Sequence, residues 1–154
     1  MDSVDRVRQA LTEMGLATEI REFAASTRTS ADAAAAIGCS VAQIAKSLVF
    51  RAKPSGRAVL VMASGANRVD EKKLAAALGE TIGKADAEFV RAETGFAIGG
   101  VSPVGHATKP VVLIDRELFR FEEIWAAAGH PHAVVRLHPR ELERLTGAPV
   151  ADVV

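Results

Sequence analysis

The spacing of apolar residues along the chain predicts several short helices. Val4, Val7, Leu11 and Met14 recur at intervals of three and four, which places them on one helical face, and Gly15 follows as a residue that tolerates positive φ. Polar residues that can cap a helix and glycines that can end one mark the other segments. The further predicted helices cover residues 29–37, 40–46, 70–79, 86–93, 122–128 and 139–145.

Other segments have the shorter period of β-strands. Residues 47–52 and 57–63 flank the turn at 53–56, where proline and glycine predict the reversal of a β-hairpin. Three more strands are predicted over 18–23, 110–115 and 133–137. Because some strands are joined by a hairpin and others through helices, we expect an α/β or α+β fold in which helices surround a mixed sheet.

The length and composition fit one compact domain over residues 1–154, because 49% of the residues are hydrophobic and 25% are charged. Cys39 is the single cysteine, so no internal disulfide can form, as is usual in a reducing compartment. The charged segment 1–6 lacks the apolar stretch of a secretion signal. Apolar runs such as 58–63 are far shorter than the roughly 20 residues of a membrane span. We therefore expect a cytoplasmic protein that does not span a membrane.

The charge balance limits the kinds of partner. Nineteen basic and nineteen acidic side chains cancel, so contact with nucleic acid would be local or brief, and a general role in coating a duplex is disfavoured. The chain has no tyrosine and one tryptophan, which argues against a surface that stacks several bases. Chemistry on a small molecule, or on one nucleotide end, remains open.

The segment 95–106 contains four glycines, a density that predicts close approach of the backbone or positive φ. Successive glycines let amide N–H groups converge into a nest that can hold a carbonyl oxygen, a phosphate or an oxyanion. The alternative is a tight turn where the chain crosses beneath the sheet. The spacing matches neither the P-loop nor the dinucleotide-binding fingerprint.

Few other side chains have the pattern of a catalytic site. Lys46 lies between a helical face and an apolar strand, where an enclosed ammonium could bind a phosphate or carbonyl, although an ordinary lysine at a helix end is the alternative. His130 and His132 are two residues apart, the spacing that could begin a zinc site on a strand, but no third ligand is evident. Cys39 is more typical of a structural thiol than of a nucleophile, and Ser102 lacks the nucleophile-elbow motif.

Several segments resemble, in order and spacing, the YbaK/EbsC family of aminoacyl-tRNA deacylases, the free-standing relatives of the editing domain inserted in bacterial prolyl-tRNA synthetases. The resemblance covers residues 27–147, and it is specific because the segments occur as an ordered set. These segments are IAKSLVF at 44–50, MASGANRVD at 62–70, KKLA at 72–75, TGFAIGGVSPVG at 94–105, VVLID at 111–115 and GHPH at 129–132.

The resemblance implies a mixed sheet that curls like a partial barrel within surrounding helices, with a pocket for the 3′ end of a mischarged tRNA. The implied reaction is hydrolysis of the ester between an amino acid and the terminal adenosine. Such enzymes are thought to use the substrate's own ribose hydroxyl and to need no metal, other cofactor or protein nucleophile. The family's lysine corresponds to Lys46, and its glycine-x-x-x-proline loop corresponds to Gly99 and Pro103.

Within that loop, the main-chain amides of Gly99, Gly100, Val101 and Ser102 are implied to position the carbonyl or the attacking water. We assign substrate contacts to three further residues of the matching segments. These residues are Pro103, Ser64 and His130. We expect the Lys46 ammonium to face the main-chain donors of the loop across a shared cavity.

The expected partner is the 3′ end of a mischarged tRNA, with an aminoacyl-tRNA synthetase or an elongation factor as a further source of affinity, and neither DNA nor a membrane. Two other functions remain open. One is a module that binds a nucleotide or tRNA end in the same cleft without turnover, because no acid–base pair is recognisable. The other is metal-dependent hydrolysis through His130 and His132.

Overall fold

The computed structural model describes residues 2–154, so Met1 of the charged N-terminal segment lies outside the described residues. Most predicted helices are present, with bounds shifted by one or two residues. The helices are α1 (Ser3–Glu13), α2 (Ser30–Ile37), α3 (Glu71–Leu78), α4 (Ala87–Thr94) and α5 (Pro139–Thr146), and two 3₁₀ turns are η1 (Val41–Gln43) and η2 (Arg116–Arg120). Within residues 2–154, every helix is too short or too polar to cross a bilayer.

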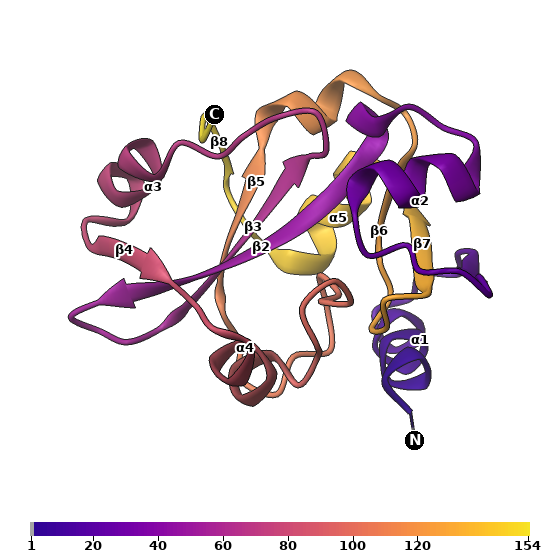
Figure 1. Cartoon of the computed structure of the whole chain (residues 1–154), viewed down its shortest axis with the longest axis horizontal. Coiled ribbons are helices and arrows are strands. Elements are labelled where there is room, and N and C mark those ends of the chain that lie inside the picture. The colour runs from indigo at the N-terminus through magenta and orange to yellow at the C-terminus, as the bar shows by residue number, and fades with distance from the viewer. Residues whose placement is uncertain (1) are drawn as a thin grey trace.

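Eight strands form one mixed sheet (Figure 1). The strands are β1 (Ile20–Glu22), β2 (Ile44–Lys53), β3 (Ala58–Ser64), β4 (Thr81–Lys84), β5 (Val111–Asp115), β6 (Ile124–Ala127), β7 (Ala133–Leu137) and β8 (Val150–Ala151). Their order is β1-β7-β6-β2-β3-β5-β8, and β4 also pairs with β2. The hairpin pair β2–β3 is antiparallel, whereas β2–β6 and β3–β5 are parallel, so the expected mixed sheet is confirmed.

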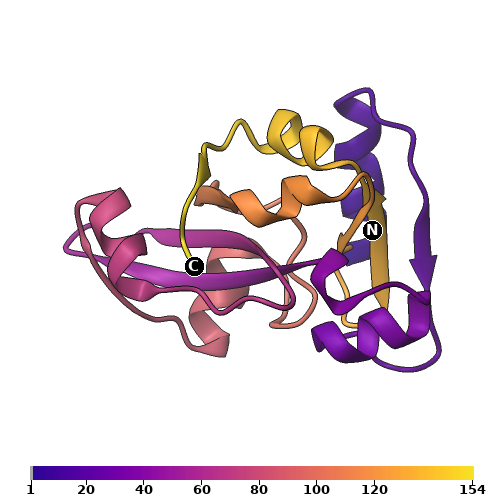
Figure 2. The same cartoon turned by 90° about the horizontal axis from the view of Figure 1, so that it is seen from above.

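The sheet is strongly curved, and helices surround it. In Figure 2, β2 and β3 lie horizontally, whereas β1 and β7 run vertically. Buried side chains from α1, α4 and α5 pack on one face of β2 and β3, and Leu74 of α3 packs on the other. A third cluster joins α2 to β6 and β7 through Ala33, Trp125 and Val134. The expected sheet surrounded by helices is therefore present.

Two predicted helices are wrong, and both segments are strands. Only the 3₁₀ turn η1 forms in 40–46, after which β2 begins at Ile44. The predicted helix over 122–128 is replaced by β6, which inserts between β7 and β2. Short apolar runs that are buried on both sides fit a helix and a strand equally well by spacing alone, and here pairing within the sheet decides. The short strands β4 and β8 were not predicted.

The correction at β2 determines where Lys46 points. Successive side chains of a strand alternate between the two faces of the sheet. Ala45 and Val49 join the cluster with α1, α4 and α5, whereas Leu48 and Phe50 join the cluster with α3. Lys46 is therefore on the α3 face, and its neighbour Ser47 is on the opposite face.

Candidate active site

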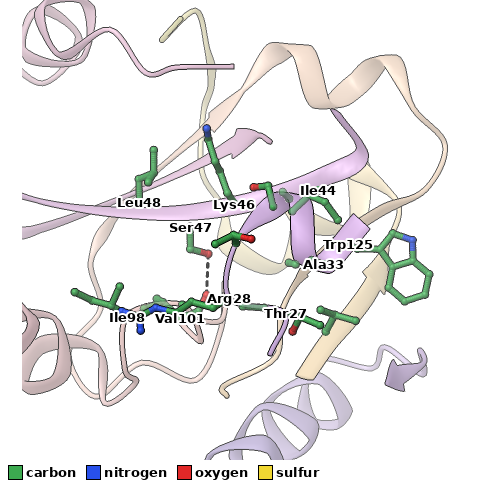
Figure 3. A pocket seen from close by; sticks show the side chains of 17 residues that line it. Thr27, Arg28, Ala33, Ile44, Lys46, Ser47, Leu48, Ile98, Val101 and Trp125 are labelled. Carbon is green, nitrogen blue, oxygen red and sulfur yellow. Dashed lines mark hydrogen bonds between the residues drawn. The ribbon is translucent and has the colours of Figure 1, made fainter. Parts of the chain in front are cut away.

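A cavity of about 310 Å³ lies beside β2, between α2, β6 and the glycine-rich loop. Lys46, Ser47 and Leu48 of β2 line it together with Gly99 and Val101 of the loop. Residues some fifty positions apart in the chain therefore meet around one cavity. Figure 3 shows Lys46 and Leu48 on one side of β2, with Ser47, Ile98 and Val101 on the other.

The back wall of the cavity is an open strand edge. β3 pairs with one edge of β2 along Ala45–Arg51, but the other edge pairs with β6 only at Ile44 and Ala45 and with β4 only from Phe50 onward. In the part of the chain that the structure describes, no strand pairs with residues 46–49 on this edge.

The main-chain groups of Ser47 face this open edge. The N–H of Ala52 donates to Arg57, and the carbonyl of Ile44 accepts from Gly65, so both residues turn their main-chain groups toward β3. Alternate residues of an antiparallel strand point their N–H and C=O to opposite edges. Ser47 is an odd number of positions from both Ala52 and Ile44, so its main-chain groups point to the edge opposite β3. Its N–H and C=O therefore face the cavity.

The glycine-rich loop adds further donors on the facing wall. Gly100 donates its N–H to Ala97 at 2.9 Å, which makes a tight turn, and Gly99 has φ +89°, a conformation that favours glycine. Within residues 2–154, the main-chain N–H groups of Gly99, Val101 and Ser102 have no hydrogen-bond partner. Because buried N–H groups are almost always paired in native proteins, such a set beside a cavity is a candidate site for a carbonyl oxygen or an oxyanion.

Neighbouring elements fix the position of this loop. The hydroxyl of Ser47 donates to the carbonyl of Val101 at 2.7 Å (Figure 3). Gly100 lies against the main chain of His130, where an added Cβ would approach backbone atoms to 2.8–2.9 Å. Nε2 of His106 is 2.6 Å from the carbonyl of Ser102, and burial lowers the pKa of His106, which favours the neutral imidazole at pH 7.

An arginine from α1 holds the beginning of the same loop. Arg6 donates to the carbonyl of Gly95 at 2.7 Å, and its guanidinium lies 4.4 Å from the ring centre of Phe96. Phe96 is 1% exposed, so the loop is anchored in the core on the side away from the cavity. The donors of the loop are therefore held on a rigid support, as electrostatic preorganisation requires.

The Lys46 ammonium does not face those donors. It donates to the main-chain carbonyl of Asn67, on the α3 side of β2, and Figure 3 shows it pointing away from Val101. Burial lowers the pKa of Lys46, and the carboxylate of Asp115 opposes that shift. The segment that carries Lys46 and the glycine-rich loop share a cavity, as expected. The Lys46 ammonium, however, lies on one face of β2 and the loop lies on the other.

Asp115 organises the turn that accepts the Lys46 hydrogen bond. This carboxylate is 1% exposed and accepts from the main-chain N–H of Ser64 at 3.0 Å and from Nδ2 of Asn67 at 3.2 Å. Its other oxygen accepts from the main-chain N–H of Glu117 at 2.9 Å. Asp115 therefore positions residues 64–67, and its negative charge also favours the charged form of Lys46.

The other predicted site residues lie around the cavity without lining it. Ser64 is 2% exposed and donates its hydroxyl to Ala42 at 2.7 Å, so it supports the start of β2. Ser102 is fully buried, and its hydroxyl accepts from the N–H of Val104. His130 supports Gly100 from behind, and Pro103 lines a separate cavity of about 320 Å³ between α1 and α5.

The side chains considered for other chemistry lie outside the cavity. Nδ1 of His130 accepts from the main-chain N–H of His132, and among residues 2–154 no three His, Cys, Asp or Glu side chains gather as metal ligands would. Burial raises the pKa of Cys39, which disfavours the reactive thiolate. The lining residues include no histidine, cysteine or carboxylate, so the cavity offers two cationic side chains, those of Arg28 and Lys46, together with hydroxyls and main-chain groups.

Sequence reasoning missed several lining residues. Ala33 of α2, Ile44 of β2 and Trp125 of β6 form apolar walls, and Arg28 lies at the loop that precedes α2. Trp125, the single tryptophan, was assigned to a helix, and only its pairing in the sheet brings it to the cavity. Arg28 is next to the predicted cap of α2, but nothing in the local pattern indicates which cavity it borders.

Comparison with known proteins gives concordant matches. The model of the aminoacyl-tRNA editing domain matches residues 24–145. The uncharacterised protein YwhH of Bacillus subtilis (strain 168) is 34% identical over 148 residues, which cover 96% of this chain and 94% of that protein.

Solved structures extend the likeness to the fold. A crystal structure described as a candidate trans-editing enzyme for prolyl tRNA synthetase is 46% identical, with a TM-score of 0.93 over 99% of this chain and 97% of that chain. The hypothetical protein APE2540 is 32% identical, with a TM-score of 0.89 over 96% of this chain and 98% of that one.

Proposed function

The chain belongs to the aminoacyl-tRNA editing domain family, and from that membership we propose that it is a trans-editing deacylase that hydrolyses the ester of a mischarged tRNA. The observation that supports this most is the set of unpaired main-chain N–H groups at Gly99 and Val101, on the wall of a cavity opposite the open edge of β2. Donors of this kind suit an ester carbonyl whose oxygen becomes negative during hydrolysis.

The cavity favours direct attack by water over a covalent intermediate. The hydroxyl of Ser47 lines the cavity, and it is already bonded to the carbonyl of Val101. In the proposed reaction a water oxygen bonds to the ester carbon, assisted by the neighbouring ribose hydroxyl of the substrate. The bond from that carbon to the ribose oxygen then breaks, a proton passes to the ribose oxygen, and the free amino acid and tRNA separate.

Main-chain groups on two sides would position the ester. The N–H groups of Gly99 and Val101 stabilise the developing oxyanion, and Ser47 presents an N–H and a C=O from the strand edge. Lys46 lines the cavity from the opposite face of β2. Its ammonium carries three donors, of which Asn67 uses one, and we assign the remaining donors to holding the terminal ribose near the ester.

Selection among amino acids would come from the size of the apolar wall. Ala33, Ile44 and Trp125 are each at most 6% exposed, so this wall cannot expand freely. One methylene in such a pocket changes the binding free energy by only about 1–3 kcal/mol. A synthetase therefore benefits from a second, separate site that hydrolyses the wrong product.

The test is deacylation of a panel of mischarged tRNAs by the wild type, by Lys46→Ala and by the control Lys53→Ala. Lys53 is an exposed lysine at the far end of the same strand and outside the cavity. We expect the wild type and the control to hydrolyse the same members, and Lys46→Ala to be about 10- to 100-fold slower, the effect of losing a hydrogen bond from a charged group.

Binding of the panel without hydrolysis would favour the alternative, a non-catalytic module for a tRNA end. Full activity of Lys46→Ala would remove Lys46 from the mechanism while leaving the loop donors in place.

A further inference from the structure

We infer that Arg28 binds the phosphodiester of the terminal tRNA nucleotide at the mouth of the cavity. This inference rests on the proposed function and adds a subsite for the nucleic acid backbone. The loop that precedes α2 brings Arg28 to the rim, where it lines the same cavity as Gly99 and Val101 (Figure 3).

The glycine-rich loop leaves space for the side chain of Arg28. An added Cβ at Gly99 would overlap Cγ of Arg28 and would lie 3.1 Å from its Cδ and 3.2 Å from its Nε. The absence of a side chain at Gly99 therefore leaves room for the arginine stem. Arg28 lies directly over one of the residues that supply the unpaired N–H donors.

The backbone at Arg28 is held on both sides. Thr27 is 7% exposed, and its N–H and hydroxyl donate to the carbonyl of Pro131 at 2.7 and 3.0 Å. Thr29, on the other side, is the N-cap of α2 and accepts from the N–H of Asp32 at 3.0 Å. The exposed guanidinium therefore projects from a fixed point, which reduces the conformational entropy lost when it binds a ligand.

The charge of Arg28 is not neutralised by the protein. Among residues 2–154, its guanidinium makes no ion pair and no hydrogen bond, and no carboxylate lines the cavity. The other cation, Lys46, is engaged by Asn67, and the Asp115 carboxylate opposes the lowering of its pKa by burial. A ligand in the cavity therefore meets one free guanidinium, beside the loop donors.

An aminoacylated nucleotide matches this arrangement. With the ester at Gly99 and Val101, its ribose lies toward the mouth, and the 5′-phosphate is the next charged group along the chain. A guanidinium can bind two phosphate oxygens at once, a geometry that an ammonium cannot reproduce. Because every tRNA carries this phosphate, the contact would position the ester without selecting the amino acid.

The test compares two minimal substrates carrying an amino acid that the panel identifies. One is the aminoacyl ester of adenosine, and the other is the same ester of adenosine 5′-monophosphate. We expect the wild type to have about tenfold higher kcat/KM for the phosphorylated substrate, mainly through KM, the effect of one charge-assisted hydrogen-bonded contact. Arg28→Gln, which keeps the stem over Gly99, is expected to lose this preference.

Arg140→Gln is the matched control, because Arg140 is an exposed arginine of α5 outside the cavity. It should keep the preference, whereas Arg28→Lys should keep only part of it. Equal rates on the two substrates in the wild type, or an unchanged preference in Arg28→Gln, would overturn the inference while leaving deacylation established. No hydrolysis of any ester by the wild type would instead overturn the proposed function.

Discussion

Gly100 shows how a single residue sets the geometry of the site. Its N–H closes the turn to Ala97, and its missing side chain lets the loop approach the main chain of His130. The glycine density of 95–106 correctly indicated a close backbone approach, but which segment would be approached depends on the fold. The resemblance likewise identified Lys46, yet the direction of its ammonium could not be predicted while the segment was assigned to a helix.

Gly100→Ala is expected to displace the loop, because its Cβ would lie 2.8–2.9 Å from main-chain atoms of His130 that cannot rotate away. The predicted loss in the free energy of unfolding is about 1–3 kcal/mol, as for other overpacked sites, and deacylation should slow because the donors move. Urea denaturation and kcat measurements test both parts.

Gly83→Ala is the control for this change, since its added Cβ would meet nothing closer than 3.8 Å and its φ is not positive. Wild-type activity in Gly100→Ala would show that the loop donors do not need their present position.

At the scale of elements, β2 is the strand on which the site depends. The predicted hairpin with β3 is confirmed, because turn residues between two short apolar segments specify it locally. The open edge at residues 46–49 could not be predicted, since it results from β6 and β4 pairing with different ends of β2. β6 and β4 come from positions 124–127 and 81–84, and no local sequence pattern indicates which residues of β2 each of them pairs with.

Asp115, at the end of β5, is expected to set the pH range over which Lys46 stays charged. Burial lowers the pKa of Lys46 and the Asp115 carboxylate opposes this, so Asp115→Asn should lower that pKa further. A lysine with a lower pKa loses its proton at lower pH. If the reaction needs the ammonium, the alkaline decline of kcat in Asp115→Asn begins at lower pH than in the wild type.

Glu117→Gln serves as the comparison for this profile, because that carboxylate is two residues away and reaches Arg120 at 3.5 Å instead of Lys46. Circular dichroism of each variant would separate a shifted profile from loss of folding. Superimposable pH profiles for Asp115→Asn and the wild type would show that the charge on Lys46 is not required.

At the scale of the whole molecule, curvature of the sheet brings the parts of the site together. The class of fold followed from the mixture of hairpin and helix-separated strands, and the ordered motifs indicated the family. The cavity itself is formed by long-range packing between α2, β6 and the glycine-rich loop, so its volume and its apolar wall were not accessible from the sequence. The balanced charge of the chain is consistent with local recognition of a tRNA end.

The most direct measurement is a crystal structure with an amide analogue of the aminoacyl adenosine 5′-phosphate, which has no ester to be hydrolysed. We predict that the analogue lies along the open edge of β2, with its carbonyl oxygen about 2.7–3.1 Å from the main-chain nitrogens of Gly99 and Val101. An analogue seated between α1 and α5, or one whose carbonyl points to solvent while those N–H groups stay unpaired, would contradict the account.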